Sequence, residues 1–241
     1  MTDTSDRPKV GVVKPTKTSN SFQDLVDLMP GVEFISRYLD IRNYSVEEFE
    51  TIMPVYDRMV AELAAEGVDL IHPEGAPPFM IQGLQFERER VKTWLDTYQR
   101  PVFTTGMTQL AAMKALGIEK FMGLTPFLGV LADAFTRYFT DAGFEVLAMG
   151  RPTAEGQDIN ALSPQEIYDL IVRSFKDQPG APEALYILGS NWRAFDVIDE
   201  LERELGVPLL HPVAVRCWYI SKQLGMTDPI SGHGRLLAEM P

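Results

Sequence analysis

The chain has 241 residues, of which 45% are hydrophobic and 23% charged, as expected for a globular protein with a full core. Its formal net charge of −12 argues against nucleic acid and anionic membranes as partners. The single cysteine, Cys217, rules out an intrachain disulfide, and the chain shows neither a signal peptide nor an apolar run of ~20 residues, so we expect a cytoplasmic protein.

The first hundred residues alternate strands with helices. Residues 1–8 are predicted to be a disordered tail, and a polar loop, 14–20, follows the first strand. A capping box, Ser45 with Glu48, begins one helix, which Pro54 is expected to kink or split. The predicted elements are strands over 9–13, 32–39 and 68–72 and helices over 45–67 and 86–98.

The second part of the chain continues this alternation. A helix is expected to begin at Thr125-Pro126 and to end at Gly143, and Ser163 with Glu166 forms a second capping box. Single helices between strands imply parallel pairing through right-handed crossovers. The other predicted elements are strands over 101–105, 121–124, 144–149, 185–188 and 207–210, and helices over 108–116, 164–176, 193–205 and 213–224.

One arrangement occurs twice: a strand, a glycine-containing loop, a helix, a strand and a helix, over 68–118 and again over 184–225. This repeat predicts an α/β fold of two pseudo-symmetric Rossmann-like domains with parallel four-stranded sheets. Ligands of such sheets bind beyond the carboxyl ends of the strands, so we expect one active site in the cleft between the halves. The predicted domains are 1–118 plus 214–241 and 119–213, and the predicted site loops are 14–20, 74–83, 189–193 and 211–213.

Several segments carry a family resemblance: 101–143, the capped helix after it, LGSNWRAFDVIDELE, 208–218 and the tail GHGRLL. Together they resemble the aspartate/glutamate racemase superfamily, and within it the branch of maleate cis–trans isomerase and arylmalonate decarboxylase. The resemblance implies two similar α/β domains with the active site between them. It also implies action on small carboxylates without a metal or an organic cofactor.

The resemblance further implies two catalytic cysteines, one at the start of each glycine-containing loop. Here Gly75 and Gly189 occupy these positions, and Cys217 is predicted to lie in the core of the last helix. A racemase that works with two thiols is therefore excluded. An isomerase that adds a thiol to a double bond is nearly excluded as well. What the resemblance leaves is a carboxylate-binding site, with Phe127 replacing a family tyrosine. The predicted substrate-binding residues are Asn20, Gly75, Ala76, Phe127, Gly189, Ser190 and Asn191.

Three side chains are candidates for acid–base chemistry. Lys14 ends the first strand and could hold a carboxylate or donate a proton, or it could be a solvated loop residue. Glu74 precedes Gly75 and could act as a general acid or base, or it could be an exposed loop residue. His211 ends the last strand and could carry a proton near neutral pH. His72, Glu74 and His211 show no tight metal-ligand spacing, so no metal site is predicted.

We therefore predict a cofactor-independent lyase of the decarboxylase type, or an isomerase, acting on a small dicarboxylic acid through an enolate-like intermediate. One alternative is a hydrolase or hydratase that uses Glu74 as its base. Another is a non-catalytic protein that binds a small carboxylate, since the loss of both thiols would also mark an inactive relative. Apolar helix faces near Tyr138 and Phe139 allow a homo-oligomer.

Overall fold

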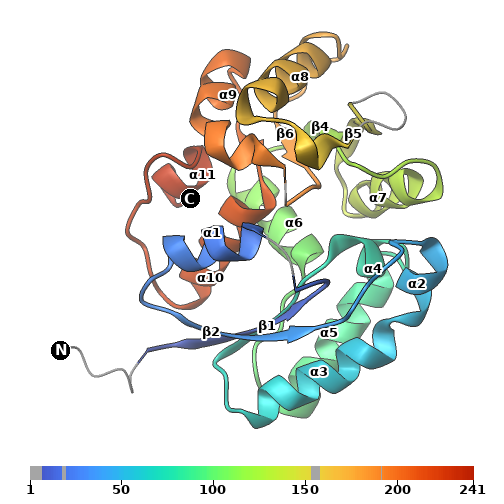
Figure 1. The fold of residues 1–241 in the computed structure, drawn as a ribbon, viewed down its shortest axis with the longest axis vertical. Coiled ribbons are helices and arrows are strands. Elements are labelled where there is room, and N and C mark those ends of the chain that lie inside the picture. The colour runs from blue at the N-terminus through green and yellow to red at the C-terminus, as the bar shows by residue number, and fades with distance from the viewer. Residues whose placement is uncertain (1–6, 18–19, 153–157, 191) are drawn as a thin grey trace. The chain divides into compact units, whose positions relative to one another are not determined.

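A computed structural model of the chain describes residues 7–17, 20–152, 158–190 and 192–241 (Figure 1). It divides into two compact units, Met1–Met107 and Thr108–Pro241. Each unit contains a parallel sheet with helices, which confirms the predicted α/β class. Most of the tail predicted over 1–8 lies outside the described residues. None of the helices within the described ranges is both long and apolar enough to cross a membrane.

The first unit is built on a sheet of strand order β2-β1-β3. The chain passes from β1 to one neighbour and then back to the other, so right-handed crossovers place α1 and α3 on opposite faces (Figure 1). Its elements are β1 (Lys9–Lys14), α1 (Asn20–Leu28), β2 (Glu33–Tyr38), α2 (Val46–Thr51), α3 (Met53–Ala65), β3 (Leu70–Pro73), α4 (Ala76–Met80), α5 (Leu84–Tyr98) and the start of α6 (Thr105–Ala115).

The predicted fourth strand of this sheet, 101–105, is reduced to one parallel bridge between Ile71 and Val102. The Ile71 N–H donates to the Pro101 carbonyl, and the Phe103 N–H donates to the Ile71 carbonyl. The ladder goes no further because the chain enters α6 at Thr105. The first sheet therefore has three strands rather than four.

Helix α3 packs tightly on the sheet. Its buried residues recur at helical spacing: Met53, Tyr56, Val60 and Leu63. Gly11 of β1 allows this close approach, because a Cβ atom there would lie 3.0 Å from Leu63 Cδ2. As predicted, Pro54 splits the helix, with α2 ending at Thr51 and α3 beginning at Met53.

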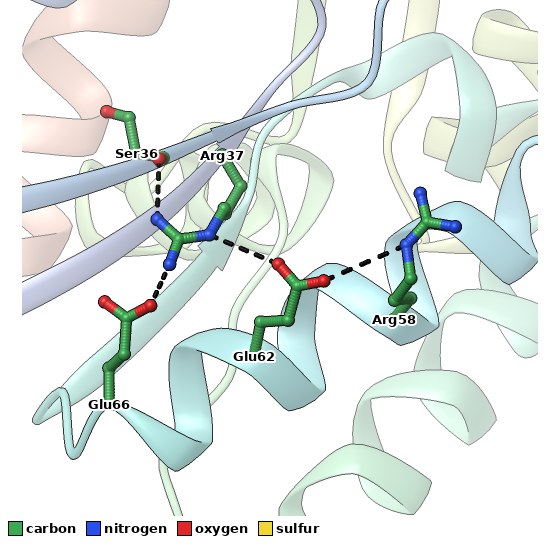
Figure 2. Close-up of polar contacts among 5 residues, drawn as sticks. All are labelled: Ser36, Arg37, Arg58, Glu62 and Glu66. Atoms are coloured by element: carbon green, nitrogen blue, oxygen red, sulfur yellow. Dashed lines mark hydrogen bonds and ion pairs between the residues drawn. The ribbon is translucent and has the colours of Figure 1, made fainter.

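A polar network ties α3 to the edge strand β2 (Figure 2). Arg37 of β2 contacts Glu62 through Nε at 3.3 Å, and its Nη2 contacts Glu66. Arg37 Nη1 also donates to the Ser36 carbonyl at 3.0 Å, and Arg58 lies 3.9 Å from Glu62. All these groups are partly exposed, so the network contributes modestly to stability.

The second unit has the strand order β5-β4-β6-β7. Its core contains a ring cluster of Phe121, Phe139, Phe144 and Tyr186, with centroids 5.0 to 6.5 Å apart. Helices α8 and α9 pack against each other (Figure 1). The elements are β4 (Lys120–Leu124), α7 (Val130–Asp141), β5 (Glu145–Gly150), η2 (Ile159–Ala161), α8 (Pro164–Lys176), β6 (Leu185–Ile187), η3 (Arg193–Val197), α9 (Ile198–Leu205), β7 (Leu209–Leu210), α10 (Pro212–Gln223) and α11 (Arg235–Glu239).

The two units repeat one topology. With Val102 taken as its fourth position, the first sheet reads β2-β1-β3-Val102, which matches β5-β4-β6-β7 in the second. The predicted pseudo-symmetry of the halves is therefore present in the strand order.

The C-terminal segment belongs to the second compact unit. Asp199 of α9 accepts a hydrogen bond from the Gly234 N–H, and Glu202 accepts from the N–H groups of Leu209 and Arg235, each at 2.7 Å. The predicted assignment of 214–241 to the N-terminal half stays a prediction.

Several local expectations need correction. Four short helices within the described ranges were not predicted: α1, α4, α11 and the 3-10 helix η2. The helix expected to begin at Thr125-Pro126 begins at Val130, and the first five residues of the helix expected over 193–205 form a 3-10 turn. The capping box of Ser163 and Glu166 is confirmed. These helices were missed because a short helix has too few residues to show a periodic pattern. In addition, α4 has two consecutive prolines in its first turn, and a Pro-Pro sequence is typical of a loop.

The network in Figure 2 yields a prediction. Replacing Arg37→Gln should lower the free energy of unfolding by about 1 kcal/mol or less, because the partners are partly exposed. Urea unfolding measures this change, and the loss should shrink at 1 M salt. Arg42→Gln, which removes the more exposed pair with Asp40, is the control and should have a smaller effect. Equal losses in the two variants would contradict the assigned role.

Candidate functional site

Strand order locates a candidate site in each unit. In doubly wound sheets, ligands bind where adjacent connections leave in opposite directions, beyond the carboxyl ends of the strands. That point lies after β1 and β3 in the first unit and after β4 and β6 in the second. The sequence at these ends supplies Lys14 and Glu74 in the first unit, and Phe127 and Gly189 in the second.

Lys14 and Glu74 lie at neighbouring strand ends. Val13 pairs with Pro73 in the parallel ladder, and the Glu74 N–H donates to the Val13 carbonyl at 2.8 Å. The residues that follow, Lys14 and Glu74, are both buried, 3% and 7% exposed. The alternative reading of both as solvated loop residues is therefore wrong.

Aromatic rings surround the Lys14 ammonium. Lys14 Nζ lies 4.1 Å from the ring centroid of Phe22 and 5.5 Å from that of Tyr38. Such contacts stabilise a cation that has lost part of its hydration. Lys17 is more distant, 5.9 Å from the Tyr38 ring. The first unit thus holds a cation and a carboxylate at the ends of adjacent strands, where little water reaches them.

Gly75 has a backbone conformation that other residues avoid, with φ +119° and ψ 106°. The buried Tyr56 hydroxyl donates to the Glu74 carbonyl at 2.5 Å, and a Cβ atom at Gly75 would lie 2.7 Å from that hydroxyl oxygen. Burial, together with the Glu74 charge, raises the pKa of Tyr56 well above its usual value, so the phenol stays a donor. Tyr56 therefore fixes the turn that follows Glu74.

The Gly75 N–H donates to Thr105 Oγ1 at 3.2 Å, within the first unit. Ala76 follows as the first residue of α4 and is buried, and Pro77 and Pro78 supply no N–H groups. In this structure the backbone N–H of Gly75 is therefore already bonded, to Thr105 of the same unit. Carboxylate binding by Gly75 and Ala76 stays a prediction.

A buried polar cluster beneath this end of the sheet was not foreseen. Thr104 Oγ1 donates to Glu87 Oε1 at 2.6 Å, and both residues are fully buried. Glu87 lies on the buried face of α5, between Leu84 and Val91. An acidic residue on the apolar face of a helix is the sequence feature that could have predicted this buried polar contact. His72 stacks on Phe103 and its Nδ1 bonds the Phe103 carbonyl at 2.9 Å, which indicates a structural role.

In the second unit, Phe127 follows β4 and is half-buried, with its ring 5.7 Å from that of Phe135. The exposed residues Leu128 and Val130 extend this apolar segment. Ser190 is half-buried after β6. The predicted contacts of Asn191 and of the Asn20 side chain lie outside what the structure describes.

Gly189 is restricted by space. A Cβ atom there would lie 2.6 Å from Cε2 and Nε1 of Trp192, whose indole folds back over the glycine. The Trp192 side chain is 2% exposed. The backbone N–H of Trp192 donates to the Gly189 carbonyl at 3.0 Å. A cysteine side chain at Gly189 would collide with the indole in this conformation.

His211 is the N-cap of α10. It is fully buried, its Nδ1 accepts a hydrogen bond from the Val213 N–H at 3.3 Å, and its ring lies 5.3 Å from that of Phe195. Burial, with a further contribution from the Arg216 guanidinium, lowers the pKa of His211 to about 3, although the Trp192 backbone opposes this shift. Burial therefore favours the neutral imidazole at pH 7, and the role of His211 as a proton carrier stays a prediction.

The chain's one thiol is chemically inert. Cys217 is fully buried within α10, and burial raises its pKa to about 12. A thiol with this pKa is not a nucleophile at neutral pH. Among the residues that the structure describes, no three His, Cys, Asp or Glu side chains gather as a metal site would require.

The fold and these strand ends define a two-unit, doubly wound α/β protein with a candidate small-ligand site at each switch point. The sequence profile of the arylmalonate decarboxylase family matches residues 10–237, and the chain belongs to this family.

Solved structures agree with the fold. The maleate isomerase Iso from Pseudomonas putida S16 is 17% identical, with a TM-score of 0.85 over 98% of this chain and 100% of its own. A liganded arylmalonate decarboxylase, in which one glycine is replaced by cysteine and one cysteine by serine, is 19% identical, with a TM-score of 0.84 over 96% and 99%. A mutant of the Nocardia farcinica maleate cis-trans isomerase with a covalently bound succinylcysteine intermediate is 19% identical, with a TM-score of 0.81 over 96% and 98%. A comparison with curated proteins gave no match.

Gly75 offers a test of the locked turn. Gly75→Ala should lower the free energy of unfolding by roughly 2–3 kcal/mol, because it adds backbone strain and a collision with the Tyr56 hydroxyl. Gly83→Ala is the matched control, since Gly83 has φ +95° but no atom of the described residues within 4 Å of its Cβ position. Urea unfolding should show the smaller loss for Gly83→Ala, and equal losses would contradict the lock.

His211 predicts a pH dependence of stability. Its folded pKa, about 3, lies below the usual value of 6.5, so its contribution is complete above pH 6.5 and is lost as the pH falls toward 3. His211→Asn keeps an N-cap acceptor without this titration. Between pH 6.5 and 4, unfolding free energies should fall less steeply in the variant, by up to about 1.4 kcal/mol per pH unit. Parallel curves would refute the assignment.

Proposed function

We propose that this protein is a thiol-free decarboxylase of a malonate-type acid that works without metal or organic cofactor. The observation that carries the proposal is the combination of an inert thiol, Cys217, with a buried pair, Lys14 and Glu74, at the switch point of the first sheet. Membership of the arylmalonate decarboxylase family supports the reaction class.

Decarboxylation suits a site without a thiol. When a malonate-type acid loses carbon dioxide, the electron pair of the breaking C–C bond passes into an enediolate, and no base is needed to start the step. The site must stabilise the enediolate charge and then return one proton to the carbon. Isomerisation by addition to a double bond would instead require a thiolate nucleophile. Cys217 does not supply one, because burial raises its pKa to about 12.

Lys14 and Glu74 divide these tasks in the proposal. The Lys14 ammonium binds a substrate carboxylate and stabilises the developing charge, since a poorly hydrated cation interacts strongly with an anion. In each turnover the Glu74 carboxylate takes up one proton from solvent and delivers it to the α-carbon. His211, neutral and used as a helix cap, is left out of the proton transfer.

The test is proton NMR in D₂O with the purified protein and a panel of malonates, maleate and hydroxy acids. A malonate should lose carbon dioxide and gain deuterium at the α-carbon. Glu74→Gln should lower kcat by about 100-fold or more, as expected for loss of a proton donor. Cys217→Ala should stay within about twofold of the wild type, since position 217 is buried in α10.

A loss of turnover in a folded Cys217→Ala variant would overturn the thiol-free mechanism. Full activity of Glu74→Gln would remove Glu74 from the proton transfer. Silence across the panel, with line broadening of the added carboxylates alone, would instead favour a non-catalytic carboxylate-binding protein.

A further inference from the structure

Tyr38, the last residue of β2, has two lysine ammonium groups beside its ring. Lys14 Nζ lies 5.5 Å from the ring centroid, and Lys17 Nζ lies 5.9 Å from it. Tyr38 pairs with Lys14 in the parallel ladder, so the ring belongs to the carboxyl ends of the strands. Lys17 follows Lys14 by three residues, in the connection that leaves β1. Both cations therefore lie at the switch point of the first unit.

The two ammonium groups repel each other, and an aromatic ring has no net charge with which to cancel that repulsion. No ion pair joins Lys17 to any other residue that the structure describes. The first turn of α1 has no acidic residue, and Asp40, which follows Tyr38 by two residues, is paired with Arg42. In a chain with a net charge of −12, this connection is a local concentration of positive charge, which favours an anionic ligand.

The two lysines differ in their environment. Lys14 is 3% exposed, whereas Lys17 is exposed to solvent. A buried ammonium group interacts strongly with an anion, and an exposed one interacts more weakly because water competes. Their distances to the shared ring keep the two Nζ atoms within reach of one dicarboxylate of three or four carbons, with a hydrogen bond of about 2.8 Å at each end.

We propose that Lys17 is a specificity-determining residue, which binds the second carboxylate of a substrate whose first carboxylate binds Lys14. The inference rests on the proposed function for the place of Lys14 in the substrate site, but it does not depend on turnover. Decarboxylation releases one carboxylate as carbon dioxide and adds one proton to the α-carbon. The product therefore has a single carboxylate and loses its contact with Lys17, so this residue favours substrate over product.

The test measures the binding of succinate and butyrate to the full-length protein by isothermal titration calorimetry. These four-carbon acids have two carboxylates and one, and neither is a malonate, so binding is measured without decarboxylation. The wild-type protein should bind succinate at least fivefold more tightly than butyrate at low salt. Lys17→Gln should raise the Kd of succinate by about fivefold, as expected for loss of an exposed ion pair, and that of butyrate by less than twofold.

Two further variants separate a specific contact from a general change of charge. Lys17→Arg should keep the affinity for succinate, since it retains the cation. Lys9→Gln removes the same charge at the amino end of β1 and should leave both Kd values unchanged. A wild-type Kd for succinate in Lys17→Gln would overturn the inference. So would an equal loss of affinity for the two acids, an equal effect of Lys9→Gln, or failure of both acids to bind.

Kinetics separate this inference from the proposed function. With a malonate that is decarboxylated, Lys17→Gln should raise KM about fivefold and change kcat less than twofold, because the lost contact is made mainly in the bound substrate. Lys17-dependent binding of succinate without turnover of any malonate would support the inference and reject the decarboxylase. Turnover with KM and Kd unchanged in Lys17→Gln would support the decarboxylase and overturn the inference.

Discussion

Parallel pairing of β1 with both β2 and β3 is the constraint on which the first unit depends. The connection that follows β1 runs toward β2, and the connection that follows β3 runs the opposite way. The two connections diverge at the carboxyl ends of these strands and leave room for a ligand there. The same pairing sets Val13 beside Pro73 and so brings Lys14 and Glu74 to neighbouring positions. The second unit repeats this order around β4, which places Phe127 and Gly189 after the corresponding strands.

The turn after β3 shows how the fold maintains a demanding conformation. The Tyr56 hydroxyl is buried and needs an acceptor, and the Glu74 carbonyl supplies it. The turn can approach the phenol only because Gly75 has no side chain. Helix α3, which carries Tyr56, packs on β1 and β3, so the packing of the core also positions the candidate acid.

Charge and burial together narrow the chemistry. The chain is acidic, with a formal net charge of −12, so binding of an anionic substrate requires local cations or donors. Lys14 is a buried cation with the Phe22 and Tyr38 rings beside its ammonium group. Cys217 and His211 are also buried, but there burial holds each in its neutral form at pH 7. Burial thus holds His211 and Cys217 neutral and leaves Lys14 and Glu74 as the acid–base candidates among those named from the sequence.

The sequence by itself determined the α/β class, the repeat of two halves, the split helix at Pro54 and the capping box at Ser163, because these depend on local periodicity and on backbone chemistry. It also singled out Lys14, Glu74, Gly75 and Gly189 as candidate site residues. Only the tertiary structure decided that Lys14 and Glu74 are buried, that His211 is a neutral helix cap and that Trp192 covers Gly189. Those properties depend on neighbours distant in sequence, and burial by such neighbours is what shifts a pKa or removes the water from a donor.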